Sequence, residues 1–382
     1  MNDFSELLRR IRLLHERPEG ALPLHAPVFQ GREREYVLDA VDSSFVSSVG
    51  AYVNRLEDML QDICGVRRAV VCVNGTAALH AALFLAGVRP GDLVVTQAFS
   101  FVATANAIRH AGADPVFLDV DAETLGLSPQ AVRDFLVREC GRVEGACLHK
   151  ASGRRVAACV PMHTFGFPCR VQELCELCAA WGIPVVEDAA EALGSRIAGR
   201  HCGSFGLLGI LSFNGNKIVT TGGGGAILTD SEALGELAKH LTTTAKRPHP
   251  WEYRHDAVAW NYRMPNLNAA LGCAQLERLD EFVARKRALA DRYAALFADT
   301  PWEFLREPEG SAGNYWLCSV LLRGTEERDA FLEAGNAAGV MLRPAWELLA
   351  DLPMYENCPR DGLGVSRGIA ARLVNLPSGV RA

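Results

Sequence analysis

Short apolar runs alternate with helix-like stretches through the first half of the chain. The runs are rich in valine and other apolar residues and lie at 69–73, 92–96, 115–119, 157–161 and 184–188. Strands that are apolar along their whole length and separated by helices are typical of a parallel sheet that helices cover on both faces. The pattern therefore predicts an α/β domain built on a mostly parallel sheet.

The stretches between these runs have helical patterns. An alanine-rich helix is predicted over residues 75–87 and another over residues 103–110. A further helix is expected to begin near Ser128-Pro129, because serine is a favourable N-cap and proline fits the first helical turn.

The character of the sequence changes after about residue 245. A long charged helix is predicted over residues 269–297, and a shorter α+β segment follows it. A chain of 382 residues, 49% of them hydrophobic, can bury a large core and is typical of two domains. We expect residues 1–250 to form an N-terminal arm and a large α/β domain, and residues 251–382 to form a smaller α+β domain.

Composition argues against nucleic acid and membranes as partners. The net charge is only −6, and no block of like charges occurs. No apolar run approaches the roughly twenty residues that a membrane-spanning helix needs, and residues 1–20 lack the apolar centre of a signal peptide. We expect a soluble, cytoplasmic protein.

The twelve cysteines are expected to be free thiols rather than a disulfide framework. Cys175 and Cys178 form a CxxC pair, which is half of a zinc-binding pattern. They lie in a helix-like stretch with no second pair after it, so we interpret them as core residues and expect no metal site.

One lysine lies in a setting that suits chemistry. Lys217 ends the run Ser212-Phe213-Asn214-Gly215-Asn216-Lys217, and upstream the apolar run 184–188 ends in Asp188. Pyridoxal phosphate (PLP) chemistry needs such a pair, because the lysine amine bonds the aldehyde and the acid keeps the pyridine nitrogen protonated. The alternatives are an ordinary surface lysine and an aspartate that caps a helix.

Further candidate residues follow the strand ends, where ligands bind in sheets of this kind. Asn74-Gly75-Thr76 joins a strand to a helix, and the free N–H groups at a helix start suit a phosphate. Ser212 is a second candidate donor to that phosphate. An ordinary helix cap is the alternative explanation of the first motif.

Two more residues suit the same ligand. Phe101 follows the second strand, where an aromatic ring can lie against a pyridine ring, although a plain core position explains it as well. Glu191 lies one helical turn after Asp188 and is placed to face the same ligand.

Five motifs occur in a fixed order along nearly the whole chain, from about Leu24 to Pro377. They are Gly75-Thr76, Phe101, Glu187-Asp188-Ala189-Ala190-Glu191, Ser212-Phe213 through Lys217, and Asn261-Tyr262-Arg263-Met264. Together they resemble the DegT/StrS group of PLP-dependent nucleotide-sugar aminotransferases. The resemblance implies a fold-type I architecture with a mostly parallel seven-stranded sheet, and a homodimer in which Asn261 reaches the cofactor phosphate of the neighbouring subunit.

Finer features resemble one branch of this group, which acts in the bacillosamine and legionaminic acid pathways. They include Pro161-Met162-His163-Thr164-Phe165-Gly166, Leu241-Thr242-Thr243-Thr244-Ala245-Lys246, and Trp251-Glu252-Tyr253 with His255-Asp256. Two positions depart from the wider group: Gly223 replaces a common glutamate, and Glu191 stands where many relatives have glutamine or histidine.

The branch implies transfer of an amino group from L-glutamate to C4 of a UDP- or GDP-linked 4-keto-6-deoxy-N-acetylhexosamine. Lys217 would bind PLP and move the proton, and Asp188 would hold the ring nitrogen. The expected substrate-binding residues are His163, Asn314, Tyr315, Trp316 and Arg343.

Three other functions are alternatives to transamination. They are a PLP-dependent sugar dehydratase, a non-catalytic sensor of PLP or sugar nucleotide, and, because of the alternating sheet, a dinucleotide-binding oxidoreductase. Relatives that dehydrate sugars have histidine in place of the lysine, and no GxGxxG follows the first strand, so transamination is the better inference.

Overall fold

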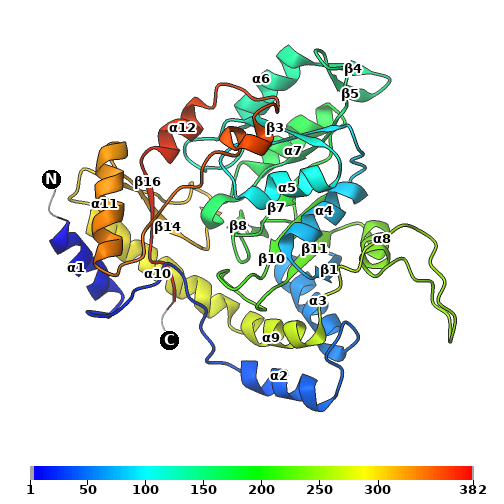
Figure 1. The fold of residues 1–382 in the computed structure, drawn as a ribbon, viewed down its shortest axis with the longest axis horizontal. Helices are drawn as coiled ribbons and strands as arrows, with labels where there is room; N and C mark the ends of the chain where they lie inside the picture. Colours follow the sequence, from blue (N-terminus) through cyan, green and yellow to red (C-terminus); the bar gives the residue numbers. More distant parts are fainter. Residues whose placement is uncertain (1–3, 381–382) are drawn as a thin grey trace.

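The computed structural model of the protein describes residues 4–380 (Figure 1), so the first three residues of the predicted arm and the last two of the predicted small domain lie outside that range. The five apolar runs all form strands, with ends shifted by a residue or two. They are β1 (Arg68–Cys72), β2 (Leu93–Gln97), β3 (Asp114–Leu118), β6 (Val156–Val160) and β7 (Val186–Asp188).

The predicted helices between the strands are also present. They are α4 (Gly75–Leu85), α5 (Val102–His110), α6 (Pro129–Glu139) and α7 (Val171–Ala180). Ser128 caps α6 as expected, because its Oγ accepts a hydrogen bond of 3.2 Å from the N–H of Ala131.

The strands are mostly parallel, as predicted, but they lie in two sheets rather than in one seven-stranded sheet. One sheet has the order β1-β11-β10-β7 and the other the order β3-β2-β6, where β10 is Leu208–Ser212 and β11 is Gly225–Thr229. Strand β11 pairs antiparallel with both β1 and β10, whereas β7 with β10 and β2 with β3 and β6 are parallel. The chain returns from β10 to β11 without a crossover helix, which is typical of an antiparallel pair.

Two prolines explain why the sheets are separate. Only single bridges join β6 to β7, at Cys159 with Val185 and at Met162 with Asp188. Pro161 and Pro184 lie at this junction and have no N–H to donate, so a continuous ladder cannot form there. Their carbonyls do accept bonds of 2.9 Å, from Asp188 N and Cys159 N respectively.

The predicted helix over 269–297 is two helices. Helix α9 (Asn266–Leu276) packs on α2 (Glu33–Asp42) and α3 (Ala51–Cys64), whereas α10 (Leu279–Phe297) packs on α1 (Ser5–Leu14) (Figure 1). The break falls at Arg278, whose φ of −112° and ψ of 9° are not helical. Helix α10 begins in the same core as α9, at Leu279 and Phe282, and ends in the core of the C-terminal region, at Tyr293 and Phe297.

An antiparallel sheet forms the centre of the C-terminal region. Its order is β12-β14-β16-β15, and helices α11 (Thr325–Ala337) and α12 (Gly364–Ala370) accompany it. The strands are Glu303–Phe304, Cys318–Leu321, Leu373–Leu376 and Arg343–Pro344 in that order. The N-terminal helix α1, which the sequence groups with the large domain, contributes Leu7, Leu8 and Ile11 to this C-terminal core.

Several short elements were not predicted. They are the hairpin β4 (Cys140–Val143) with β5 (Ala146–His149), and the three-stranded sheet β13-β8-β9 formed by Ser311–Ala312, Arg196–Ile197 and Arg200–His201. None of the helices within residues 4–380 is both long enough and apolar enough to cross a bilayer.

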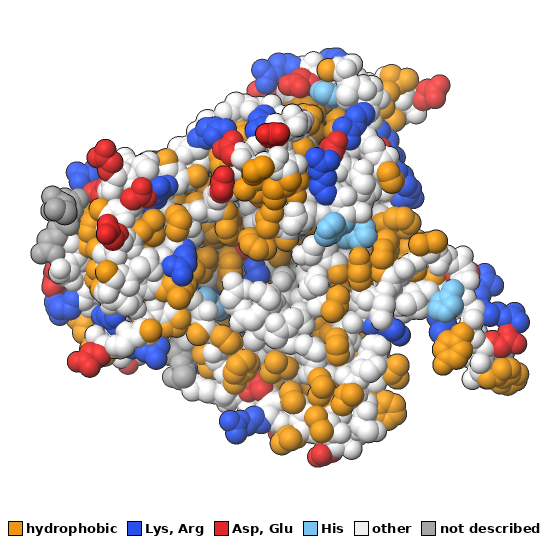
Figure 2. All heavy atoms as spheres, viewed as in Figure 1, with side chains coloured by type: hydrophobic (Ala, Val, Ile, Leu, Met, Phe, Trp, Pro, Cys, Tyr) orange, Lys and Arg blue, Asp and Glu red, His pale blue; other side chains and the backbone are white. Residues whose placement is uncertain are grey.

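A segment between α8 (Glu232–Thr242) and α9 projects from the body of the molecule (Figures 1 and 2). Its large apolar side chains face outward: Trp251 is 78% exposed, Tyr253 81% and Val258 96%. Contacts within this chain therefore leave the projecting segment, residues 243–262, largely uncovered.

Candidate active site

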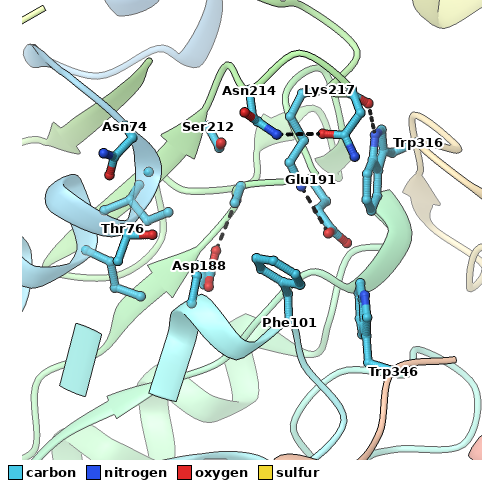
Figure 3. A pocket seen from close by; sticks show the side chains of 16 residues that line it. Asn74, Thr76, Phe101, Asp188, Glu191, Ser212, Asn214, Lys217, Trp316 and Trp346 are labelled. Carbon is cyan, nitrogen blue, oxygen red and sulfur yellow. Dashed lines mark hydrogen bonds and ion pairs between the residues drawn. The ribbon is translucent and has the colours of Figure 1, made fainter. Parts of the chain in front are cut away.

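A cavity of about 340 Å³ lies where β7 and β10 end and α4 begins (Figure 3). Its wall unites residues far apart in the sequence: Asn74, Gly75, Thr76, Phe101, Asp188, Glu191, Ser212, Asn214, Asn216, Lys217, Trp316 and Trp346. All of the predicted cofactor-binding residues except Asn261 are in this wall. The ligand site expected at the strand ends is therefore a real hollow.

The start of α4 forms one side of the cavity. Asn74 caps the helix, because its Oδ1 accepts a hydrogen bond of 2.8 Å from Ala77 N. The first N–H groups of a helix have no partner within it and favour an anion. Gly75 keeps this end open, since a Cβ there would lie 2.9 Å from Cβ of Ser212 and 3.2 Å from its hydroxyl oxygen.

Asp188 lies at the floor of the cavity and is 4% exposed. One carboxylate oxygen accepts from Thr104 Oγ1 at 2.8 Å and the other from Ala190 N at 3.2 Å. Burial raises the pKa of Asp188 despite these bonds and the nearby Lys217 charge. No helix begins at this position, so the N-cap alternative is wrong. A buried carboxylate without a cation beside it is costly, and a protonated ring nitrogen would supply that cation.

Lys217 lies in the loop after β10, and its side chain is only 12% exposed. The amine is 3.1 Å from Glu191 Oε1 and 3.9 Å from the centre of the Trp316 ring (Figure 3). The alternative of a surface lysine is therefore wrong. An amine held in a cavity between a carboxylate and an indole is placed to act on a bound molecule.

Glu191 is almost completely buried beside this amine. Its other oxygen, Oε2, accepts a hydrogen bond of 2.9 Å from Phe165 N. Burial raises the pKa of Glu191 to about 7, although the Lys217 ammonium acts in the opposite direction. The carboxyl group can therefore gain or lose a proton near neutral pH.

Phe101 is not a core residue, because 49% of its surface is exposed. Its ring lies 6.2 Å from that of Trp346, and both rings border the cavity (Figure 3).

The sequence did not identify Trp346, Asn214 or Asn216 as site residues. The two asparagines stand beside Lys217 in the sequence, and this proximity was the available signal.

Three of the predicted substrate-binding residues lie behind the cavity wall. His163 and Asn314 have no exposed surface and Tyr315 is 1% exposed. His163 Nε2 lies 3.0 Å from Glu187 Oε2, and its Nδ1 accepts from Cys169 N. A side chain that is covered on all sides does not contact a substrate, so these expectations are corrected. Of the two neighbours Tyr315 and Trp316, only Trp316 borders the cavity.

The two remaining predicted residues are exposed but lie outside this chain's cavity. Arg343 donates to Asn336 Oδ1 at 3.0 Å, on the C-terminal sheet. Asn261 lies at the base of the projecting segment and accepts from Arg263 Nε at 2.8 Å.

The cysteine pair of α7 has core contacts. Cys178 is buried, and Cys175 donates to the carbonyl of Phe205 at 3.6 Å. Across residues 4–380 there is no group of three or more His, Cys, Asp or Glu side chains that could hold a metal ion.

The cavity wall fits PLP. Gly75 opens a helix start that suits the phosphate, together with Thr76 and Ser212. Phe101 offers a ring face, Asp188 a buried acid, and Lys217 an amine.

Comparison with known proteins agrees with this fit. The model of the DegT/DnrJ/EryC1/StrS aminotransferase family matches residues 28–381. GDP-perosamine synthase of Vibrio cholerae is 34% identical over 364 residues, which cover 94% of each chain. EpsN of Bacillus subtilis, whose name describes a pyridoxal phosphate-dependent aminotransferase, is 36% identical over 361 residues, covering 93% of this chain and 90% of EpsN.

A solved structure shows the same fold. The aminotransferase TlmJ from Streptoalloteichus hindustanus superposes with a TM-score of 0.85 at 29% identity, covering 94% of each chain. The fold-type I expectation is thus supported, with two sheets in place of one and with β11 antiparallel to its neighbours. Because the family model spans nearly the whole chain and relatives are more than 30% identical over nine tenths of it, the protein belongs to the DegT/DnrJ/EryC1/StrS aminotransferase family of PLP-dependent nucleotide-sugar aminotransferases.

Proposed function

We propose that the protein transfers the amino group of L-glutamate to C4 of a UDP- or GDP-linked 4-keto-6-deoxy-N-acetylhexosamine. The product is a 4-amino-4,6-dideoxy sugar nucleotide for bacterial glycan or nonulosonate biosynthesis. One observation carries the transamination in this proposal: the amine of Lys217 lies in the cavity, 3.1 Å from Glu191, and Asp188 lines the same cavity.

Each residue has a distinct role in the proposed reaction. PLP, when bound, supplies an electron sink for the carbanion that forms when the carbon bearing the amino group loses a proton. Lys217 Nζ takes that proton and returns it to a neighbouring carbon, as a general base and then a general acid. Asp188 holds the proton of the ring nitrogen, and the start of α4 with Ser212 binds the phosphate.

The sugar nucleotide is the finer part of the proposal. The motifs at 161–166, 241–246 and 251–256 support the branch of the bacillosamine and legionaminic acid pathways. Relatives named GDP-perosamine synthase, from Vibrio cholerae and Escherichia coli, are 34% and 32% identical to this chain. GDP-linked substrates therefore belong in the same test as UDP-linked ones.

We also propose that the active protein is a homodimer with shared sites. Asn261 lies outside the cavity of its own chain, and the projecting segment exposes Trp251 and Tyr253. Further exposed apolar residues gather around α2, at Leu38, Val41, Phe45 and Val49. Surfaces of this kind on a folded protein mark contact sites.

Complementation between subunits tests the shared site. Lys217→Ala and Asn261→Ala proteins are prepared separately and then mixed under conditions that let subunits exchange. A mixed dimer has one site with both residues intact, so activity is expected to return on mixing. Activity that stays absent in proven mixed dimers would contradict the shared site.

The transamination itself is tested by absorbance. The purified protein loaded with PLP is expected to have a visible band that bleaches when L-glutamate is added and returns when a keto sugar nucleotide is added. Lys217→Ala is expected to lose turnover by at least about 10²-fold. Incubation with UDP- and GDP-linked 4-keto sugars, followed by NMR of the products, identifies the nucleotide and the configuration at C4. Full turnover by Lys217→Ala, or keto product formed without glutamate, would overturn the proposal.

A further inference from the structure

The side chain of Asn314 uses its hydrogen-bonding groups on two separate segments. Its amide nitrogen donates to the carbonyls of Glu191 and Leu193, at 2.8 and 2.9 Å. Its amide oxygen accepts from the backbone N–H of Trp316 at 2.7 Å. One buried side chain thereby fixes the distance between the segment after β7 and the segment before β14.

These two segments carry the two groups that contact the amine of Lys217. Glu191 Oε1 lies 3.1 Å from the Lys217 nitrogen, and the centre of the Trp316 ring lies 3.9 Å from it. The indole N–H of Trp316 also donates to the carbonyl of Asn216 at 2.7 Å, immediately before the lysine. A shift in either segment would therefore move the amine.

The surroundings of Asn314 allow little movement. Gly166 packs so closely that a Cβ there would lie 1.9 Å from Asn314 Oδ1. Tyr315 has a φ of +48°, a left-handed conformation that turns the chain sharply between Asn314 and Trp316. The Asn314 backbone N–H donates to Ser195 Oγ at 3.0 Å, and that hydroxyl in turn donates to the carbonyl of Gly166 at 2.7 Å. The amide is thus locked in one orientation.

We propose that Asn314 is a positioning residue for the catalytic lysine: by holding Glu191 and Trp316 at a fixed separation, it sets where the Lys217 amine points. This inference rests on the proposed function, since it assigns a role within that reaction. Proton transfer depends steeply on the position of the base, and a misplacement of about 1 Å can cost on the order of 10²-fold in rate.

The main variant is Asn314→Asp, which keeps the shape and the acceptor for Trp316 N but has no N–H for the two carbonyls. Asn314→Ala removes all three bonds without adding a charge and serves if the first variant does not fold. Asn375→Asp is the matched control. Asn375 is 3% exposed and its side chain bonds Ser319 and Pro344 in the C-terminal sheet, away from the lysine.

The first measurement uses protein without PLP. Lys217 is acetylated with a small amine-reactive reagent, and its modification rate is followed by peptide mass spectrometry. The Asn314 variants are expected to change this rate several-fold relative to wild type, while the Asn375 control does not. An unchanged rate in a folded Asn314 variant would overturn the inference.

The second measurement uses the PLP-loaded protein. The half-reaction with L-glutamate is expected to slow by about 10- to 100-fold in the Asn314 variants, with a smaller change in KM. The pH midpoint of the visible band is expected to shift in the same variants only. Equal effects of the Asn314 and Asn375 variants would indicate a general loss of structure and would reject the role. If wild type itself does not react with glutamate, the proposed function fails, but the acetylation result still decides the role of Asn314.

Discussion

The amine of Lys217 lies 3.9 Å above the ring of Trp316, which belongs to the C-terminal region of the chain. The indole N–H of the same tryptophan donates to the carbonyl of Asn216 at 2.7 Å. One side chain therefore contacts the lysine through its ring face and the preceding residue through its nitrogen. A cation over an aromatic face is favoured by about 0.5–2 kcal/mol, more when water is excluded.

Replacing Trp316 separates these two contacts. Trp316→Phe keeps a ring face but loses the N–H, so we expect the half-reaction with L-glutamate to slow a few-fold. Trp316→Leu loses both contacts and is expected to slow by about tenfold or more, since about 1.4 kcal/mol corresponds to tenfold. Stopped-flow absorbance of the PLP-loaded protein measures both rates.

The control for these variants is Trp302→Leu, because Trp302 packs on Phe4 and Phe331 in the C-terminal core and does not border the cavity. A Trp316→Leu protein that reacts as fast as wild type would show that the indole does not orient the amine. A slow Trp302→Leu protein would show that the effect comes from the core rather than from the site.

Gly75→Ala is expected to weaken PLP binding by about ten- to a hundredfold. A methyl group there would lie 2.9 Å from Cβ of Ser212, which is too close for the phosphate end of the site to stay open. Titration of the protein with PLP, followed by absorbance, gives the dissociation constant. Gly368→Ala on α12 is the control, because a Cβ at that position meets nothing within 4 Å. Unchanged affinity in Gly75→Ala would contradict the assignment of the phosphate to this helix start.

The buried carboxyl of Glu191 makes a prediction about stability and pH. Its pKa is raised to about 7 from an ordinary value of 4.5, so between these values the folded protein binds a proton that the unfolded chain has released. The free energy of unfolding therefore falls as pH rises through this window, by on the order of 3 kcal/mol from this group.

Glu191→Gln removes that dependence. We expect the free energy of unfolding of the PLP-free variant, measured in urea, to increase relative to that of wild type as pH rises from 4.5 to above 7. The lost partner of Lys217 adds an offset, so the pH-dependent part is the diagnostic one. Glu176→Gln, an exposed position on α7, is expected to follow the wild-type pH dependence. Parallel curves for wild type and Glu191→Gln would show that Glu191 does not titrate in this range.

Most helices and strands of the large domain could be predicted from the sequence, because hydrophobic patterns and helix caps depend on neighbouring residues. Each apolar run became a strand, and Ser128 capped the helix that follows it. The pairing of the strands could not be predicted in this way, because it depends on residues far apart in the sequence. The antiparallel β11 follows from the loop that joins it to β10 without a helix, and the break between the two sheets follows from Pro161 and Pro184 at their junction.

The site shows the same division between local and distant information. Lys217, Asp188 and Gly75 stand in motifs whose chemistry is evident from neighbouring residues, and all three border the cavity. Asn314, Tyr315 and Trp316 are consecutive in the sequence, and all three were expected to bind substrate. In the structure Trp316 borders the cavity, whereas Asn314 is buried behind it. Only the fold decides which of them borders the cavity.

Lys286 offers a test of how the cavity wall is anchored. It is 1% exposed, and its amine donates to the carbonyls of Trp316 at 3.2 Å and Ser378 at 2.5 Å. Burial lowers the pKa of Lys286 to about 7 from an ordinary value of 10.5. Between these values the unfolded chain holds a proton that the folded protein lacks, so the free energy of unfolding rises with pH, by on the order of 5 kcal/mol from this group.

We expect Lys286→Met to lose this rise between pH 7 and pH 10 in urea unfolding, while its overall stability falls because two hydrogen bonds are gone. The matched control is Lys150→Met, since Lys150 also donates to two backbone carbonyls, of Val137 and Arg138, but is exposed. That control is expected to keep the wild-type slope. A neutral amine still donates to both carbonyls, so the contact of Lys286 with Trp316 survives the loss of its proton. We therefore expect the rate of the half-reaction with glutamate to depend on pH near 7 in the same way in wild type and in Lys286→Met. A wild-type slope in Lys286→Met would mean that the buried amine is charged throughout this range.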